Sequence, residues 1–399
     1  MIQKYSLVLI GLVIFALVGT WFYREKGDSP SHYSYQKDRS AYTGILNPAD
    51  FEFIDERVYG MIVSHHFYVE RLISQSFLSI QTQKPGRIVI IGPDHFGASK
   101  YDISVSKLPY ETPFGTLQPD EEIIERLEKV GVFRDEDAFV HEHSISALVG
   151  SIKAVFPETK IVPLILDRNI YFGKLEQLAA VLDEILPDDS LVVASVDFSH
   201  HLNRFASDFH DLKSIATIQS FDYESIKNLE IDSPPSIFTL LKYLELRGAQ
   251  RMIYKNTNQA YISGNLGSED VTSYVFANFV RGGSPGGKAI ARLMYPAGFS
   301  DFEGVMGVEG NFLRGFDERI EYGEALKQSL NLSDPEVAEI DYLVGQLLDD
   351  SGQSRYHIFP FRATDSGTAL LEYDGAVKVC EEILKARDSQ DYCWFNNPE

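Results

Sequence analysis

Cysteine is nearly absent from this sequence and is confined to one end of it. The two cysteines, Cys380 and Cys393, both lie close to the C-terminus. With so few thiols the chain can form neither a disulfide scaffold nor a CxxC metal site. A single bridge between these two residues remains open if this end of the chain meets an oxidising compartment.

Positive charge is scarce as well. The chain has 36 Lys and Arg against 58 Asp and Glu, which gives a formal net charge of −22. Nucleic-acid binding depends on a clustered basic face, and the sequence contains no such cluster. We therefore expect no nucleic-acid partner. The rest of the composition, 44% hydrophobic with 12% aromatic residues, is ample for a large core in a chain of 399 residues.

The N-terminus carries a long apolar run. Ser6 to Tyr23 is uncharged, mostly apolar and 18 residues long, with Lys4 before it and Arg24 after it, which is about the minimum length for a helix that spans a bilayer. No A-x-A-like cleavage site follows, so residues 1–26 are interpreted as a retained membrane anchor in preference to a cleaved signal peptide. We expect membrane attachment through residues 6–23, with the main domain outside the cytoplasm.

Residues 27–45 are polar, rich in Ser and Tyr, and without periodicity, which is typical of a linker. His32 in this segment is expected to be solvated. The following 46–283 segment is interpreted as one α/β domain, because it ends at the turn-prone Gly-Gly-Ser-Pro-Gly-Gly stretch, 282–287. The remaining 288–399 segment is predicted to contain helical pieces at 333–349 and 375–386, and we assign it no role.

Short β-branched runs alternate with amphipathic helical patterns inside the predicted domain. The predicted strands are 60–63, 87–91, 160–166, 190–194 and 271–280, and the predicted helices are 69–80, 121–130, 144–156, 171–186, 209–219 and 236–246. This order predicts a three-layer α/β/α fold with a mostly parallel central sheet. Ligands in such folds bind beyond the carboxyl ends of the strands.

Histidines gather at these predicted strand ends. Seven of the ten lie in four short segments between residues 63 and 201; they are His65, His66, His95, His141, His143, His200 and His201. Imidazole binds iron, copper and zinc well, and several His from distant loops can form one site with open positions. The clustering therefore predicts a metal site.

Six segments in order carry a resemblance to a known family. They are Ser64-His65-His66, Gly92-Pro93-Asp94-His95, Thr112-Pro113-Phe114-Gly115, Glu142-His143-Ser144-Ile145, Lys160-Ile161-Val162-Pro163 and Ser195-Val196-Asp197-Phe198-Ser199-His200. Residues 58–280 thus resemble the Memo-like family, also called AmmeMemoRadiSam system protein B, which is similar to class III extradiol ring-cleaving dioxygenases. The N-terminal run and the segment beyond residue 288 lie outside the resemblance.

The resemblance implies a metal-binding cleft lined by His65, His95 and His200. His66, next to His65 on extended backbone, should point elsewhere and support the site indirectly. Asp94 stands where the family usually has Ser and could bring a further carboxylate toward the metal. His141, His201 and His210 are interpreted as solvated or structural.

Three further residues near the predicted site are candidates for catalytic or supporting roles. Glu142 could supply a carboxylate to the metal or act as a general base, or could only interact favourably with the dipole of the helix that follows while Ser144 caps that helix. His143 is a candidate acid or base. Asp197 could orient a ligand histidine, or could be a turn residue.

Departures from the family pattern limit the inference. Ser64 replaces the usual Pro, and Phe67 replaces a usual Gly. Some members of the family have a Cys in the late loop, which here is 254–259 and contains none. Thiol-dependent chemistry is therefore in doubt.

Three functions fit these residues. The first is a metal-dependent oxidoreductase related to extradiol dioxygenases, with Fe or Cu favoured. The second is a hydrolase in which Zn activates a bound water and Glu142 assists it. The third is a non-catalytic module that binds a small molecule or peptide in the same His-lined cleft.

Overall fold

The computed structural model describes most residues between 30 and 282, and five strands beyond residue 282. The described ranges are 30–48, 51, 53–202, 204–219, 221–224, 226–265, 268, 270–282, 290–294, 340–348, 354–364, 367–370 and 392–393. Within these ranges no helix has the length and apolar character needed to cross a bilayer. The predicted anchor, 6–23, lies outside them, so membrane attachment stays a prediction.

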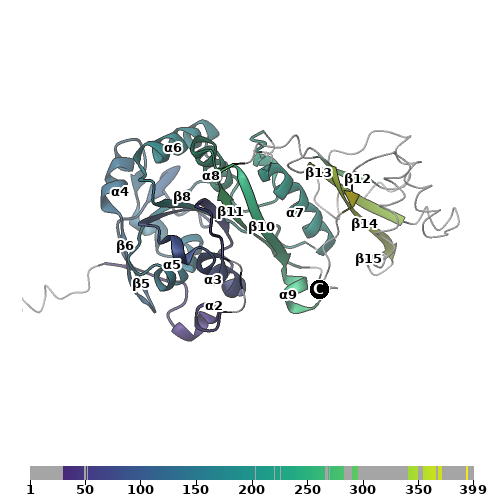
Figure 1. Ribbon diagram of the computed structural model, residues 1–399, viewed down its shortest axis with the longest axis horizontal. Helices are drawn as coiled ribbons and strands as arrows, with labels where there is room; N and C mark the ends of the chain where they lie inside the picture. Colours follow the sequence, from purple (N-terminus) through teal and green to yellow (C-terminus); the bar gives the residue numbers. More distant parts are fainter. Residues whose placement is uncertain are drawn as a thin grey trace, which may run out of the picture.

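An eleven-stranded sheet forms the centre of the fold (Figure 1). Its strands run in the order β1-β5-β6-β8-β3-β9-β2-β11-β10, with β4 paired to β8 and β7 to β4. Neighbours from β6 to β2 are parallel, whereas β11 and β10 are antiparallel. The bounds are β1 His32–Tyr33, β2 Val58–Val63, β3 Arg87–Pro93, β4 Ile103–Val105, β5 Tyr110–Thr112, β6 Gly115–Pro119, β7 Phe133–Arg134, β8 Lys160–Leu166, β9 Ser190–Ser195, β10 Arg251–Asn258 and β11 Ser273–Val280.

Helices cover both faces of this sheet. The α-helices are α2 Thr43–Leu46, α3 Glu70–Leu78, α4 Glu121–Glu128, α5 His143–Val155, α6 Phe172–Ile185, α7 Arg204–Gln219, α8 Pro234–Arg247 and α9 Gln259–Ser263, and 3₁₀ turns lie at Arg39–Ala41, Phe67–Val69, Gln81–Gln83, Glu136–Phe139 and Ile226–Asn228. The prediction of a mixed α/β fold around a central sheet is confirmed. The predicted strands and helices between residues 60 and 280 all appear, with small shifts at their ends.

Alternation along β3 shows how the sequence builds two cores. Ile88 and Ile90 pack with residues of α3 and α5, whereas Val89 and Ile91 pack with residues of α6 and α8. All four side chains are fully buried. Because side chains alternate between the faces of a strand, a continuous apolar run is what a strand covered on both faces requires.

The segment predicted to be a linker forms structure instead. His32 lies in β1, which pairs in parallel with β5, and the side chain is buried rather than solvated. Its Nε2 lies 2.9 Å from Ser106 Oγ and 3.5 Å from Glu136 Oε2. The prediction that His32 is solvated was therefore wrong. Its polar partners, Ser106 and Glu136, lie 74 and 104 positions further along the chain and leave no periodic pattern near His32.

The contribution of Glu136 to the stability of the fold is expected to depend on pH. Burial raises the pKa of Glu136, but hydrogen bonds from His32, Ser106 and the Lys107 N–H outweigh burial and hold that pKa below its usual value. A carboxyl whose folded-state pKa is lowered stabilises the fold above its unfolded pKa, about 4.3, and loses this contribution as the pH falls through the folded value.

We expect Glu136→Gln to lower the free energy of unfolding by about 1–2 kcal/mol at pH 7, because a charged acceptor of buried donors is lost. Urea unfolding of both proteins between pH 7 and pH 3 measures this. The difference should shrink below about pH 4. A difference that stays constant over this range would contradict the assignment.

The chain beyond residue 288 contributes a second, five-stranded sheet. Its order is β12-β13-β14-β15, with β16 paired to β14, and its strands are β12 Ile290–Met294, β13 Ile340–Leu348, β14 Ser354–Thr364, β15 Gly367–Leu370 and β16 Tyr392–Cys393. The predicted helix over 333–349 was wrong where β13 forms. Antiparallel pairing of β13 with both β12 and β14 overrides the local apolar spacing. The helix predicted at 375–386, and Cys380 with the proposed bridge, lie outside the described residues.

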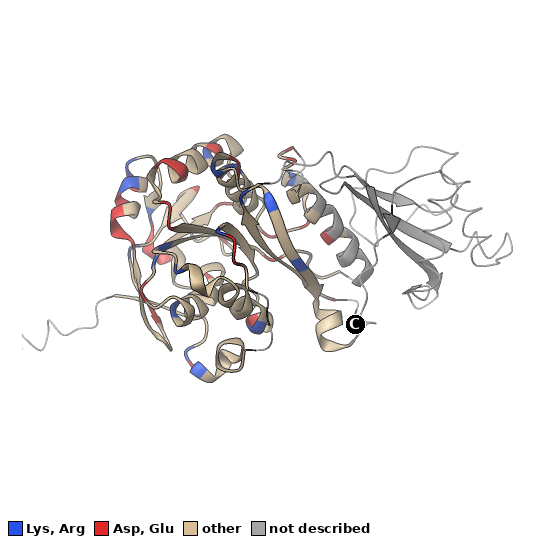
Figure 2. Cartoon of the chain, in the orientation of Figure 1, with Lys and Arg blue, Asp and Glu red and all other residues tan. Residues whose placement is uncertain are grey.

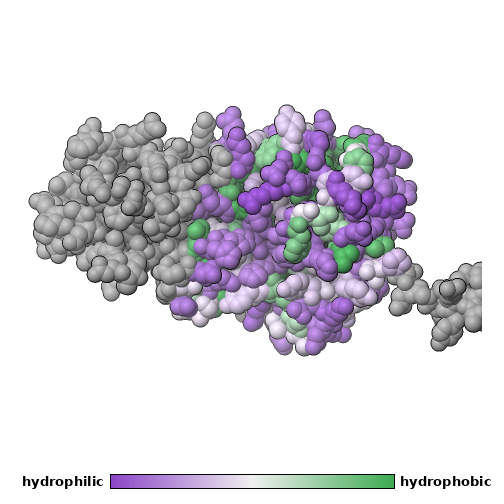
Figure 3. All heavy atoms as spheres, turned by 180° about the vertical axis from the view of Figure 1, so that it is seen from behind, coloured by the Kyte–Doolittle hydropathy of each residue, from purple (hydrophilic) through white to green (hydrophobic). Residues whose placement is uncertain are grey.

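Charged residues of both signs are interspersed along the described part of the chain. Blue and red residues alternate along the helices and loops, without a basic face in this view (Figure 2). The surface seen from behind is mostly hydrophilic, with small separate apolar patches (Figure 3). The expectation of no nucleic-acid partner stays a prediction.

Candidate metal centre

Three neighbouring parallel strands deliver the candidate ligands to one edge of the sheet. β2 ends just before His65, β3 ends just before His95, and β9 ends just before Asp197. Since β3, β9 and β2 are adjacent in the sheet, the residues that follow their carboxyl ends meet. The predicted clustering of these segments follows directly from this topology.

Two imidazoles converge on a single carboxylate oxygen. Asp232 Oδ2 lies 3.0 Å from His65 Nε2 and 3.5 Å from His95 Nε2. A second carboxylate oxygen, Asp197 Oδ2, lies 3.5 Å from His65 Nε2. Two histidines and a carboxylate therefore present their ligand atoms to the same small space.

Two buried atoms at this point lack an aligned hydrogen-bond partner. Neither His65 Nε2 nor Asp232 Oδ2 makes a hydrogen bond of acceptable geometry, although the two atoms are close. Buried polar atoms are almost always hydrogen-bonded, so this exception requires an explanation. Within the described residues, His65, His95 and His143 form one group, and His65, Asp197 and Asp232 another, whose ligand atoms all lie within 4.8 Å of one another. This donor set fits a divalent transition metal.

Glu142 holds His95 in this orientation. It caps α5 by accepting from the Ser144 N–H at 2.7 Å, and it accepts from the His95 N–H at 2.9 Å. Its Oε1 also lies 2.8 Å from His95 Nδ1. Because Glu142 engages Nδ1, the other ring nitrogen of His95 faces Asp232. Glu142 thus caps the helix and orients a histidine, whereas the predicted roles as a metal carboxylate or general base stay predictions.

A glycine allows this close approach of α5 to β3. A Cβ atom on Gly92 would lie 2.4 Å from Ser144 Oγ, so no larger residue fits without displacing the start of α5. Ser144 in turn donates to the Pro93 carbonyl at 3.1 Å. Gly92 is therefore explained by packing against the start of the helix that Glu142 caps.

His65 is oriented from its other side. Its Nδ1 lies 3.1 Å from Ser195 Oγ, which donates to the Ser144 carbonyl at 2.5 Å. Asp197 accepts from the His65 N–H at 3.2 Å and from the Ser64 hydroxyl. Asp197 therefore holds the backbone segment that carries His65, and its predicted role in orienting the ring of a ligand histidine stays a prediction.

The charges of the site favour a cation. Burial lowers the pKa of His95, but the Asp232 and Glu142 carboxylates outweigh it and raise that pKa to about 10. Burial also raises the pKa of Glu142, yet its contacts with His95 and Ser144 lower it to about 2. The pKa of Asp232 is lowered too, because His65 and His95 outweigh its burial. In the metal-free protein a proton on His95 provides the positive charge that a bound metal would otherwise supply.

His143 differs from the other two histidines in its charge. Its ring stacks on His95, with centroids 4.1 Å apart, and lies 5.2 Å from the His65 ring. Burial, together with the charge on His95 and His65, lowers the pKa of His143 to about 4. Its imidazole is therefore neutral at pH 7.

Comparison with known proteins identifies the family. The family model described as Memo-like protein matches residues 35–253, more than half of this chain. The chain belongs to the Memo-like family. A MEMO1 family protein from Nitrosopumilus maritimus is 28% identical over 176 residues, which make up 43% of this chain and 64% of the relative. One from Caldivirga maquilingensis is 32% identical over 172 residues, 42% of this chain and 58% of the relative.

The aligned part thus spans less than two thirds of these two relatives. Among solved structures, an uncharacterized protein from Escherichia coli K12 aligns over 55% of this chain and 99% of its own, at 15% identity and a TM-score of 0.37. That similarity is too low to support any inference.

Three residues of this Memo-like protein that the sequence placed at or near the metal lie outside both ligand groups of the described residues. His200 belongs to neither ligand group among the described residues; its Nε2 lies 4.0 Å from Asp197 Oδ2, and its side chain is 37% exposed. His66 turns to the Tyr274 hydroxyl, 2.8 Å from its Nδ1. Asp94 accepts from the Ala98 and Ser99 N–H groups and shapes the loop after His95.

The remaining histidines of this Memo-like protein divide between surface and interior. His141 is exposed, and His201 is exposed beside Asp270, 3.0 Å away. His210 is buried in α7. None of the three belongs to the two ligand groups found in the described part of the chain.

Asp232 was missed from the sequence of this Memo-like protein. It stands in the loop before α8, whose start is marked by the Ser233 cap and two prolines. Reciprocal backbone contacts tie it to Asp197, 35 positions earlier: the Asp232 N–H donates to the Asp197 carbonyl at 3.1 Å, and the Asp197 N–H donates to Asp232 Oδ1 at 3.2 Å. The only local signal was an acidic residue directly before a helix start.

Proposed function

We propose that this Memo-like protein is a metal-dependent oxidoreductase related to the extradiol dioxygenases. The observation that carries this proposal is the convergence of His65 Nε2 and His95 Nε2 on one oxygen of Asp232. Two histidines and one carboxylate with open positions are typical of non-haem iron oxygenases. His65, His95 and Asp232 would hold the metal, which when bound would supply redox chemistry and sites for an oxygen-donor substrate.

The chain's own residues would perform the other steps. His143, neutral at pH 7 and next to His95, would accept the proton of a substrate hydroxyl as the substrate binds. Glu142 and Ser195 would hold the rings of His95 and His65 in place. Burial of His65 and the low exposure of the Asp232 side chain, 11%, would limit access of bulk water to the inner side of the site.

The geometry favours this function over a zinc hydrolase. A hydrolase of the predicted kind needs the Glu142 carboxylate as a base for water. Both oxygens of Glu142 are already engaged by His95 and Ser144. A carboxylate held in this way orients a ligand and is poorly placed to take a proton.

Elemental analysis and oxygen uptake together test the proposal. Protein purified without chelator should contain about one equivalent of iron or copper, because the two-histidine, one-carboxylate set suits these metals. Loaded protein should consume oxygen with catechol as the probe substrate, and chelator-treated protein should not. Zinc without oxygen uptake would favour the hydrolase, and failure to bind any of the three metals would favour a binding module.

A further inference from the structure

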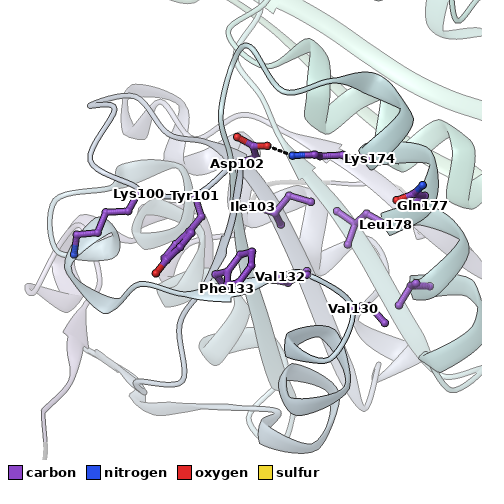
Figure 4. Close-up of a pocket in the computed structure, with 12 residues that line it drawn as sticks. Lys100, Tyr101, Asp102, Ile103, Val130, Val132, Phe133, Lys174, Gln177 and Leu178 are labelled. Atoms are coloured by element: carbon purple, nitrogen blue, oxygen red, sulfur yellow. Dashed lines mark hydrogen bonds and ion pairs between the residues drawn. The ribbon is translucent and has the colours of Figure 1, made fainter.

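A second cavity lies away from the histidines, at the other end of the loop that begins at His95. It is bounded by the end of that loop with β4, by the turn before β7, and by one side of α6 (Figure 4). Its volume is about 420 Å³, within the usual range for small-molecule sites. The lining residues used below are Tyr101, Asp102, Ile103, Phe133, Lys174 and Leu178.

One side of the cavity is apolar. Tyr101 and Phe133 stack with ring centroids 4.5 Å apart and planes 20° from parallel. Both rings remain partly exposed, whereas Ile103 and Leu178 are buried. In Figure 4 the two rings stand on one side, and Ile103 and Leu178 lie across from them. Exposed aromatic rings that face buried apolar side chains across a cavity can receive an apolar side chain.

The polar part of the cavity holds both signs of charge. Lys174 and Asp102 form an ion pair across its rim (Figure 4). Their side chains are 54% and 48% exposed, and an ion pair so exposed contributes little to stability and can open at small cost. Lys100, the other lysine of the lining, lies instead near Asp135 and Asp137, at 3.7 and 3.9 Å.

We propose that this cavity binds a small zwitterion with an apolar side chain, of the chemical class of an apolar α-amino acid. The ligand carboxylate would pair with Lys174 and its ammonium group with Asp102, while the side chain would lie against Tyr101 and Phe133. A simple anion would gain Lys174 but be repelled by Asp102, and a simple cation would meet the reverse. Only a ligand with both charges satisfies both residues.

Isothermal titration calorimetry with L-phenylalanine as the probe tests this. We expect saturable binding with a dissociation constant of about 1 mM, which is typical of a ligand of this size. The analogues 3-phenylpropionate, which lacks the ammonium group, and phenethylamine, which lacks the carboxylate, should each bind at least about tenfold more weakly. No saturation up to about 20 mM phenylalanine, or tighter binding of either analogue, would overturn the proposal.

Substitutions of the lining residues test whether phenylalanine binds in this cavity. Lys174→Met and Asp102→Asn should each weaken phenylalanine binding at least about tenfold, and Phe133→Ala should weaken it about fivefold or more. Lys174→Arg keeps the charge and should bind within about threefold of wild type. Lys242→Met is the matched control, because Lys242 also forms exposed ion pairs, with Glu176 and Glu245, outside the lining. Equal loss in Lys174→Met and Lys242→Met, or no loss in Lys174→Met, would place the ligand elsewhere.

Discussion

Asp232→Ala is expected to purify with less than about a tenth of the metal of the wild-type protein. Asp232 Oδ2 is the atom on which both His65 Nε2 and His95 Nε2 converge. Loss of an outer partner of a metal ligand already costs about 10–100-fold in affinity, and loss of a ligand itself should cost at least as much. Elemental analysis of the purified variant, with His95→Ala as the positive control for metal loss, measures the effect.

His200→Ala is the matched comparison, because the resemblance predicted His200 as the third ligand and the geometry favours Asp232. His200 Nε2 approaches Asp197 Oδ2 only to 4.0 Å and belongs to neither ligand group in the described ranges. We expect His200→Ala to keep at least about half of the metal, because the carboxylate that His200 approaches is Asp197 and not the proposed ligand Asp232, so that His200 is not an outer partner of the kind whose loss is costly. The reverse pattern, full metal in Asp232→Ala and none in His200→Ala, would show that the original assignment was correct.

Folding must be separated from metal binding in these variants. Removal of Asp232 takes away the nearer of the two carboxylates that face the buried His65 Nε2 and leaves only Asp197, 3.5 Å away, which destabilises the fold as well. Asp232→Asn keeps the volume and the contact with the Asp197 N–H but supplies a weaker ligand. Thermal unfolding of metal-free wild type and metal-free Asp232→Asn shows whether the fold persists, and metal content is then compared between proteins that are both folded.

The sequence predicted the parts of this site that follow from strand ends. His65, His95 and Asp197 each come just after a β-branched run that forms a parallel strand, and adjacent parallel strands bring such residues together. Glu142 could be found because it opens a helix with a polar cap. Each of these residues stands in the sequence where an apolar strand ends or a helix begins, and this local pattern is what made the prediction possible.

The parts that the sequence did not predict depend on contacts far along the chain. Asp232 joins the site through backbone contacts with Asp197, and a loop residue leaves no periodic trace of such contacts. His32 is buried because Ser106 and Glu136 reach it across the fold. The strand at 340–348 forms because two other strands pair with it. In each case tertiary contacts overrode the local pattern.

His143→Gln is expected to keep the metal and the fold but to lower kcat about 10²- to 10⁴-fold, the usual contribution of a general base. The neutral ring of His143, whose pKa is lowered to about 4, is the proton acceptor of the proposed reaction. Its side chain is only 33% exposed and stacks on His95, so Gln preserves much of the packing. Oxygen uptake with catechol, at equal metal content, measures the change.

The exposed His141 is the control for this prediction, because His141→Gln removes a histidine two positions away that belongs to neither ligand group among the described residues. Its kcat should stay within about twofold of wild type, as for most surface changes. The measured metal content decides what His143 does. His143 also belongs to a group with His65 and His95 whose ligand atoms lie within 4.8 Å of one another. If His143→Gln lost metal as Asp232→Ala is expected to, His143 would be a ligand, and the proton acceptor would have to be sought among His200 and His66.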